Sequence, residues 1–563
     1  MITRILNSKT KTITSAAFLL AISALLSRIL GFTRDRLLMI RFGAGEVSDM
    51  YYAAFRIPDF VYNLLIVGAI AVAFLPVFSE YFNKRKADSG DELESKENEL
   101  EKWPEQALHF TNNLLNCFLV LLVCFCVILA IFTPFIIKFI VPGFSQVNKA
   151  ITINLTRIMF LSPILFGISA IFSGILQYFD RFLIYSIAPL LYNLGIIFGI
   201  LFLVPAFGIY GLGYGVILGA FLYFLIQLPA VILVGFKYKL VMDFGQLGIR
   251  KVFKMMGPRI IGVTADNINL LVTTAIASTL AAGSISIFNL SNNFQYLPIG
   301  IIGISFAVSS FPVFSKFMAS GQKKEFFEHF SSTFCQIIFL IVPISFLFFL
   351  LRAQIIRLLY GAGNFGWVDT RLTAAALGIF CFSILANSLI PLVARAFFSF
   401  KNTKTPVIIG VMSVVLNIFF SIFFIFLMRN NHAFYNFWVE LLHLQNLKNI
   451  DVIALPLAFS LVSVMEIILM LFVLYKKIGD FGIKKIGGSF LKTLLASVFL
   501  IIPTYFIIYA VSLFVNTKTF LGIFWQTFFA GALGVAFYML GAYLLKIKEL
   551  KTIFYFVAKH LKK

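Results

Sequence analysis

The chain has 563 residues, of which 60% are apolar and only 12% are charged, about half the charged share of soluble domains. This balance argues against a soluble enzyme. The net charge is +22, and the basic residues lie mainly in short segments between apolar runs. This distribution is typical of membrane-protein loops and not of a nucleic-acid interface. Because these runs reach the roughly 20 residues that span a hydrocarbon core, the sequence predicts an all-α polytopic membrane protein.

About fourteen transmembrane helices are predicted from the apolar runs. The first run begins at Thr14, after a basic start, and is too long for a cleaved signal peptide. The longest polar segments are 83–107 and 429–451. The predicted spans are 14–33, 50–82, 109–137, 151–178, 183–206, 208–236, 252–281, 285–318, 326–351, 371–398, 405–428, 452–475, 489–514 and 519–546.

The distribution of basic residues predicts a topology. With the N-terminus in the cytoplasm, the cytoplasmic segments carry 31 of the 46 Lys and Arg residues, the external segments carry 11, and four lie within spans. Positive residues are enriched on the cytoplasmic side of membrane proteins. We therefore expect a multi-pass protein of the bacterial inner membrane with both termini in the cytoplasm.

An internal repeat divides the chain. Residues 71–81 read AVAFLPVFSEY and residues 307–317 read AVSSFPVFSKF, at an offset of 236. The two copies lie six predicted helices apart, so they cross the membrane in the same direction as a parallel repeat. We expect an N-terminal lobe over 1–236, a C-terminal lobe over 237–475 and two additional helices with a basic tail over 476–563. Such lobes predict a central cavity that works by alternating access.

Charged residues within the first two predicted helices are the candidate site, because a charge that faces lipid is costly. Arg28 lies in helix 1, and Arg34 and Asp35 follow near its end. Helix 2 carries a polar stripe, spaced by three or four residues on one face: Asp49, Tyr52, Arg56, Asp59 and Asn63. The stripe predicts contact with water or a polar ligand. The alternative is an ion-pair cluster that only joins helix 1 to helix 2.

Two further helices carry polar residues. Arg259 and Asp266 in helix 7 predict either a buried pair or an arginine that extends to the cytoplasmic interface. Amide and hydroxyl side chains in helix 8 either line the cavity or join helices: Asn289, Ser291, Asn292, Asn293 and Gln295.

Enzyme signatures are not found in the sequence. It has no Walker A, GxSxG or HExxH motif. The five cysteines lie in apolar spans without metal-ligand spacing, so neither a metal nor a cofactor is expected. Clustered arginines suit a diphosphate or a carboxylate, since guanidinium binds both bidentately. A cavity open to lipid would let a long tail stay in the bilayer while the headgroup crosses.

Several segments carry a family resemblance. They are SRILGFTRDRLLMIRFGAGEVSDMYYAAFRIPDF (27–60), AFLPVFSEY (73–81), FGISAIFSGILQYFDRF (166–182), APLLYN (188–193), GPRIIGV (257–263), LPIGIIGISFAVSSFPVFS (297–315) and ARAFFSFKNTKTP (394–406). In this order they resemble the MurJ/MviN family, which flips lipid II, the undecaprenyl-diphosphate-linked peptidoglycan precursor. The resemblance implies fourteen helices, two six-helix lobes and a cationic central cavity. It places Arg28, Arg34, Asp35 and Asp49 in or beside that cavity, and Arg56 at a basic position.

The chain departs from the family pattern at five positions. Tyr62 and Asn63 replace arginines, Val67 replaces an acid before Gly68, Asn293 replaces a cavity arginine and Tyr296 a nearby acid. Two alternatives follow: the diphosphate is bound by fewer arginines, or the chain carries a different lipid-linked headgroup.

The sequence therefore predicts a lipid II flippase for cell-wall synthesis. In it Arg28, Arg34 and Arg56 bind the diphosphate, Asp35, Asp49 and Asp59 orient these arginines, and Asn293 lies in the same site. Expected partners are the polyprenyl-diphosphate lipid, the membrane and cell-wall synthesis proteins. The alternatives are an exporter of another polyprenyl-linked saccharide, an ion-coupled drug antiporter of the same superfamily, and a non-transporting scaffold for cell-wall enzymes.

Overall fold

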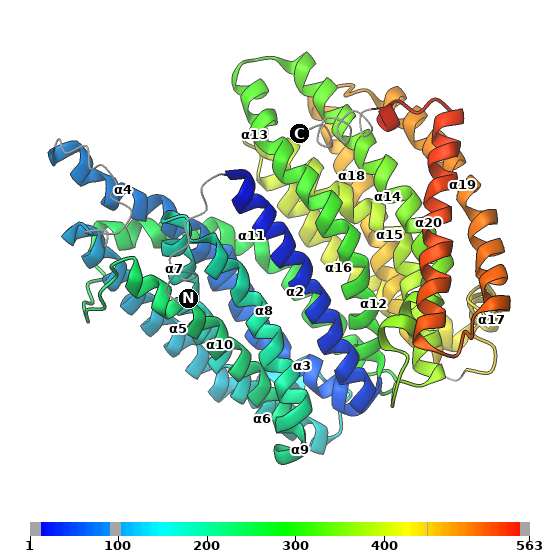
Figure 1. Cartoon of the computed structure of the whole chain (residues 1–563), viewed down its shortest axis with the longest axis horizontal. Helices are drawn as coiled ribbons and strands as arrows, with labels where there is room; N and C mark the ends of the chain where they lie inside the picture. The colour runs from blue at the N-terminus through cyan, green and yellow to red at the C-terminus, as the bar shows by residue number, and fades with distance from the viewer. Residues whose placement is uncertain (1–12, 90–102, 448, 552–563) are drawn as a thin grey trace. The chain divides into compact units, whose positions relative to one another are not determined.

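The computed structural model describes residues 13–89, 103–447 and 449–551 (Figure 1). Within these ranges the side chains of 13, 14, 16, 17, 67–69, 71, 72, 84–89 and 257–266 lie outside the description. The described residues are helical almost throughout and include no strand. The all-α prediction is confirmed.

The described helices form fourteen rods, five of which are broken into consecutive segments. A short additional helix, α17 (His432–Leu441), lies in the segment 429–451 that the sequence marks only as polar. The rods are α2 (Ile13–Phe42); α3 (Glu46–Val61), η1 (Tyr62–Ile70) and α4 (Ala71–Ser89); α5 (Glu105–Ile140); α6 (Gln146–Met159) and α7 (Leu161–Tyr178); α8 (Phe182–Phe198), η2 (Gly199–Leu203) and α9 (Val204–Phe207); α10 (Tyr210–Leu233); α11 (Leu247–Ser278); α12 (Ser284–Pro298), η3 (Ile299–Ile304) and α13 (Ser305–Ala319); α14 (Lys323–Tyr360); α15 (Trp367–Ser399); α16 (Lys404–Asn430); η4 (Ile450–Ile453) and α18 (Ala454–Ile478); α19 (Ile483–Phe514); and α20 (Phe520–Leu544).

Eleven of these rods are long and apolar enough to cross a membrane. The other three are α2, the rod from α3 to α4, and α11. Each of these three rods includes residues whose side chains lie outside the description, and the first two carry the charged residues of the predicted site. Polar residues within otherwise spanning helices of membrane proteins face protein or a cavity rather than lipid.

The internal repeat extends to backbone geometry. In the first copy the π-helix η1 ends at Ile70 and α4 begins at Ala71; in the second, η3 ends at Ile304 and α13 begins at Ser305. The repeated sequences 71–81 and 307–317 thus both follow a π-helical segment. Such segments shift the helical register and commonly bend a helix at functional positions.

The chain packs as two compact units. Unit 1 contains Met1–Phe42 and Glu46–Thr279, and unit 2 contains Gly43–Gly45 and Leu280–Lys563. Helix α11 belongs to unit 1 because it packs against η1, α5, α4 and α3. The repeat instead predicts a lobe boundary before α11, at 236/237, and this boundary of the symmetry-related lobes stays a prediction.

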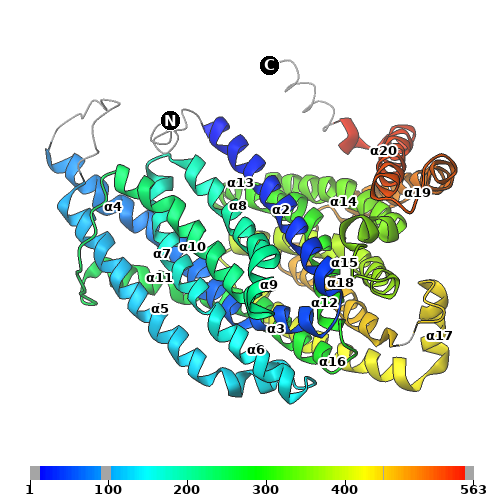
Figure 2. The same ribbon diagram turned by 60° about the horizontal axis from the view of Figure 1, so that its bottom comes forward.

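Glycines bring α8 and α10 of unit 1 into close contact, and the two helices lie side by side in Figures 1 and 2. Gly195 of α8 faces Gly219 of α10, and Gly199, the first residue of η2, faces Gly215 of α10. A Cβ atom on Gly195 would collide with the Cα of Gly219. Small residues four positions apart are the usual means of close helix packing in membranes, so this pair fixes the position of α8.

Three asparagines of α5 bond to the segment 237–246, which leads from α10 to α11: Asn112, Asn113 and Asn116. Asn113 donates from Nδ2 to the Asp243 carbonyl at 2.8 Å and accepts the Asp243 N–H at 2.6 Å. Asn112 makes the same pair of bonds with the carbonyl of Lys237 and the N–H of Lys239, at 2.9 and 2.8 Å. The side-chain amides thus satisfy backbone groups of a segment that has no helical partners.

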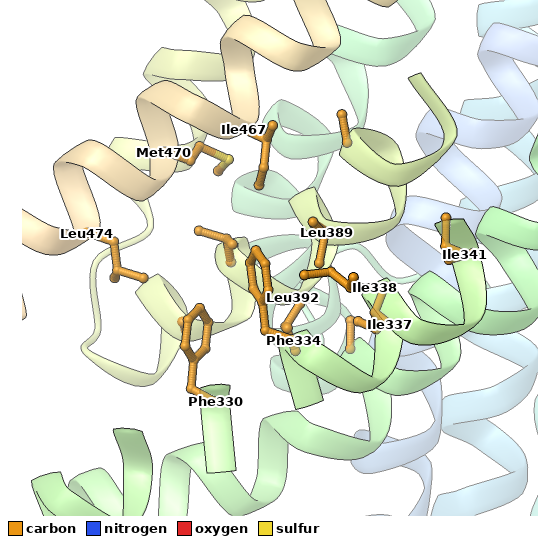
Figure 3. Close-up of a cluster of buried hydrophobic side chains, with 14 of the residues drawn as sticks. Phe330, Phe334, Ile337, Ile338, Ile341, Leu389, Leu392, Ile467, Met470 and Leu474 are labelled. Carbon is orange, nitrogen blue, oxygen red and sulfur yellow. The ribbon is translucent and has the colours of Figure 1, made fainter. Parts of the chain in front are cut away.

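The core of unit 2 is an apolar cluster between α14, α15 and α18 (Figure 3). Phe330 and Phe334 of α14 pack against Leu392 of α15 and Met470 of α18. These side chains are all nearly inaccessible. The cluster fixes α14 and α15. The ends of these helices that lie away from the cluster carry Arg352, Arg357 and Arg371.

Candidate functional site

Polar residues of α2 meet α8 in unit 1. The Arg34 guanidinium donates to Asp35 Oδ1 at 2.8 and 2.9 Å and to Asn193 Oδ1 at 3.3 Å. Asn193 Nδ2 in turn donates to the carbonyl and the hydroxyl of Ser27, at 3.3 and 3.2 Å. Because α8 is fixed by its glycine contact with α10, Asn193 gives Arg34 a defined position.

Arg56 is the most enclosed of the predicted arginines, with 7% of its surface exposed. Its Nε donates to the hydroxyl of Thr274 on α11 at 2.7 Å. Thr274 itself donates to the Leu270 carbonyl at 2.8 Å, which fixes the hydroxyl rotamer. A buried guanidinium with a side-chain partner on a different helix is positioned for a specific contact rather than for solvation.

Asp59 links the two arginines. It is half-buried on α3 and interacts electrostatically with both Arg56 and Arg34. Tyr51 and Tyr192 also lie near Arg34. We call Arg34, Asp35, Arg56 and Asp59 the arginine cluster. It brings together side chains of α2 and α3 that the sequence predicted as neighbours.

The other predicted site residues differ in how far they are exposed. Arg28 is exposed on α2, and Asp49 is 3% exposed at the start of α3. Asn293 is exposed on α12 of unit 2, and Tyr296 is 45% exposed. The side chains of Val67, Arg259 and Asp266 lie outside the described ones.

Two of the departures from the family pattern are packed into unit 1. The Tyr62 ring lies 5.0 Å from the ring of Phe166, which in turn contacts the rings of Tyr192 and Tyr223. Asn63 Nδ2 donates to Asn267 Oδ1 on α11 at 3.2 Å. Aromatic and amide side chains with defined partners therefore occupy these positions, and they add no positive charge.

The site contains residues that sequence reasoning missed. Asn193 lies in the APLLYN segment, which carried the family resemblance without a role, and Thr274 lies in an apolar stretch of α11. Among the described residues, no group of three His, Cys, Asp or Glu could hold a metal ion. What the cluster offers chemically is two guanidinium groups beside carboxylates, a set suited to a phosphate or carboxylate group.

Comparison with known proteins identifies relatives along most of the chain. A family model described as Lipid II flippase MurJ matches residues 39–529. The probable lipid II flippase MurJ of Buchnera aphidicola subsp. Schizaphis graminum is 28% identical over 418 residues, which are 73% of this chain and 77% of that protein.

Solved structures share the fold. A structure of the lipid II flippase MurJ in an inward closed conformation matches with a TM-score of 0.70 at 23% identity, covering 94% of this chain and 98% of that one. An inward-facing multidrug resistance transporter of the MATE family matches with a TM-score of 0.60 at 13% identity, covering 83% and 98%. At these identities the likeness concerns the fold alone.

Proposed function

Because this chain belongs to the MurJ family of lipid II flippases, we propose that it moves lipid II across the bacterial inner membrane. The observation that carries this proposal is the family match over residues 39–529, which includes all of α3 and α11. The eleven long apolar helices support a multi-pass membrane protein. Alternating access between the two predicted lobes stays a prediction.

Within this function, Arg34 and Arg56 bind the diphosphate. Guanidinium groups bind phosphoryl oxygens bidentately, and their shared neighbour Asp59 supports a joint role. Asp35 and Asp59 orient these arginines. Arg34 lies before the first residue of the family match, so its assignment depends on its contacts with Asp35 and Asn193.

Roles for the remaining predicted residues follow the same scheme. Arg28, which is exposed, contributes a further cation to the diphosphate; Asp49 orients an arginine, and Asn293 contacts the headgroup. Both termini lie in the cytoplasm, and the chain has no catalytic activity of its own. Cell-wall synthesis proteins are its expected partners.

The purely structural alternative is that the arginines only join helices. The Arg34–Asp35 pair lies within α2 and joins no other helix. Arg56 donates to Thr274 on α11 and Arg34 donates to Asn193 on α8, and both of these acceptors are neutral side chains. We favour ligand binding, because guanidinium groups gathered on otherwise apolar helices suit a diphosphate, which they bind bidentately.

The test is translocation of lipid II in cells depleted of their own flippase and complemented with this chain. The readout is cleavage of lipid II by a hydrolase that cannot cross the membrane. We expect rescue by the native chain and by Arg250→Ala, an exposed control on α11, and loss of rescue by Arg34→Ala and Arg56→Ala at equal abundance in the membrane.

Other outcomes would change the proposal. Rescue by all variants would remove the two arginines from the site but keep the function. Failure of the native chain, present at normal abundance, would contradict lipid II as substrate. A different polyprenyl-diphosphate lipid would then be the next substrate to test, starting from the neutral residues Tyr62 and Asn63.

A further inference from the structure

A second group of arginines lies within unit 2, around a cavity of about 450 Å³. The cavity is lined by one end of α14, the start of α15, the end of α19 and the start of α20, with the loop after α17. Helices α19 and α20 form the additional pair that follows the predicted lobes, and they lie side by side in Figures 1 and 2. The additional pair thus contributes part of the lining of this cavity.

The lining of α14 and α15 follows helical spacing. Positions 350, 353, 354 and 357 form one face of α14, and 367, 370, 371, 374 and 375 form one face of α15. The small side chains of Ala353, Ala374 and Ala375 leave the space between the two faces. The volume between the two faces is large enough for a lipid headgroup.

Positive charge dominates this lining. Arg352, Arg357 and Arg371 line the cavity, and no Asp or Glu does. The nearest acidic residue along α15, Asp369, accepts the backbone N–H groups of Ala44 and Gly366 at 3.3 and 3.2 Å. The three guanidinium groups therefore have no carboxylate within the lining to neutralise them.

The arginines are held in different ways. Arg371 donates to the carbonyls of His443 and Gln445, so it mainly anchors the loop after α17. Arg352 donates one Nη1 bond to the Phe349 carbonyl at 2.9 Å and lies over the Phe349 ring at 4.6 Å. Arg357 makes no hydrogen bond from its guanidinium within the described part of the chain. Arg352 and Arg357 thus retain donors for a ligand.

The depth of the cavity matches the headgroup region of a bilayer. Arg352 lies eight residues before the end of α14 and Arg371 four residues after the start of α15, or about 12 Å and 6 Å from the helix ends at 1.5 Å per residue. Trp367 and Tyr505, which line the cavity, are 64% and 55% exposed. Exposed Trp and Tyr side chains mark the membrane interface.

From this geometry we propose that the cavity binds the phosphodiester headgroup of an anionic membrane lipid. Arg352 and Arg357 bind the phosphate oxygens through charge-assisted hydrogen bonds. Two glutamines that line the cavity suit the hydroxyls of a polar headgroup such as phosphoglycerol. Gln354 Oε1 is buried without a partner in the described residues, and Gln526 Nε2 donates to the Ile508 carbonyl at 2.8 Å, which leaves its amide oxygen as an acceptor. The site is separate from the arginine cluster, which belongs to unit 1.

The first test is lipid binding by the purified full chain in native mass spectrometry. We expect dioleoyl phosphatidylglycerol to be retained at least ten times more strongly than dioleoyl phosphatidylcholine. The double variant Arg352→Gln, Arg357→Gln should lose this preference. Arg429→Gln is the matched control, because Arg429 is half exposed on unit 2 and already paired with Asp451 at 2.8 Å; it should bind like the native chain.

A second variant keeps the charges and removes the space. Ala374→Leu should also abolish the preference for phosphatidylglycerol, although all three arginines remain. If neither variant folds, brominated lipids test the proposal on the otherwise native chain. Brominated phosphatidylglycerol should quench the fluorescence of Trp367 more than brominated phosphatidylcholine does. The contribution of Trp367 is the difference between the native chain and Trp367→Phe.

Three outcomes would overturn the proposal. They are equal binding of the two lipids, an unchanged preference in both variants, and displacement of the lipid by inorganic phosphate or pyrophosphate at similar concentration. The last outcome would assign the cavity to a soluble anion instead.

Discussion

Replacing Thr274 by valine tests whether the hydrogen bond from α11 positions Arg56 for its ligand. The substitution keeps the shape of the side chain but removes the hydroxyl that accepts the 2.7 Å bond from Arg56 Nε. Arg56 is 7% exposed, so water does not readily replace the lost partner. A buried donor left unpaired costs about 1–3 kcal/mol, and more when it is charged.

We expect the effect to appear in lipid II binding and translocation. If the arginine must hold its geometry to bind the diphosphate, Thr274→Val lowers affinity for lipid II by roughly 10- to 100-fold, since each 1.4 kcal/mol is a factor of ten. Thr274→Ser retains the hydroxyl and should bind nearly as the native chain does. The measurements are lipid II binding to the purified chain and rescue in flippase-depleted cells. Thr274→Val that lowers thermal stability but leaves both readouts unchanged would refute the positioning role.

Three further perturbations test contacts elsewhere in the fold. Gly219→Leu should separate α10 from Gly195 of α8 and lower the thermal midpoint of the detergent-solubilised protein, whereas a midpoint equal to that of the native chain would contradict the close contact. Asn113→Ala removes both bonds to Asp243 and should speed amide hydrogen exchange in 237–246 with α5 unchanged; equal exchange would show that the asparagine does not hold this segment. The N–H groups of Ile483 and Gly482 hold the pKa of Asp480 below its usual range, so these bonds are present at neutral pH and weaken as the pH falls below about 4. Asp480→Ala should therefore show fast exchange at these two amides at pH 7, and protection equal to the native chain would exclude the capping role.

The polar stripe of α3 could be predicted because its information is local. Steps of three and four residues put Arg56 and Asp59 on one face whatever the rest of the fold does, and in the structure Asp59 interacts electrostatically with both Arg56 and Arg34. Their partners could not be predicted. Thr274 lies 218 residues from Arg56, and Asn193 lies 159 residues from Arg34. Neither partner has a distinctive sequence setting, so only the packing of α8 and α11 identifies them.

The closeness of charged residues in the sequence predicted their contacts less well than their angular position around the helix did. Arg28 and Arg34 are six residues apart, which is about 240° around a helix of 3.6 residues per turn. They therefore point to different sides of α2, and Arg28 is exposed while Arg34 bonds to Asn193. The helix α17 was not predicted for a different reason. This helix has only 10 residues. It is therefore too short to cross a membrane, and it lies within a segment that is polar as a whole.

The two arginine groups of the chain differ in how they are neutralised, and this difference bears on their roles. In unit 1, Arg34 is paired with Asp35 at 2.8 Å, and Asp59 interacts with both Arg34 and Arg56. A ligand that leaves such a cluster is replaced by carboxylates already present, so the guanidinium groups are not left uncompensated. In unit 2, no carboxylate lines the cavity around Arg352 and Arg357. A departing anion there would leave partly buried charge without a protein partner, which disfavours release. A transport site must release its ligand, whereas a site for a resident lipid must retain it. The distribution of acidic residues therefore favours transport at the arginine cluster of unit 1 and lipid retention in the cavity of unit 2.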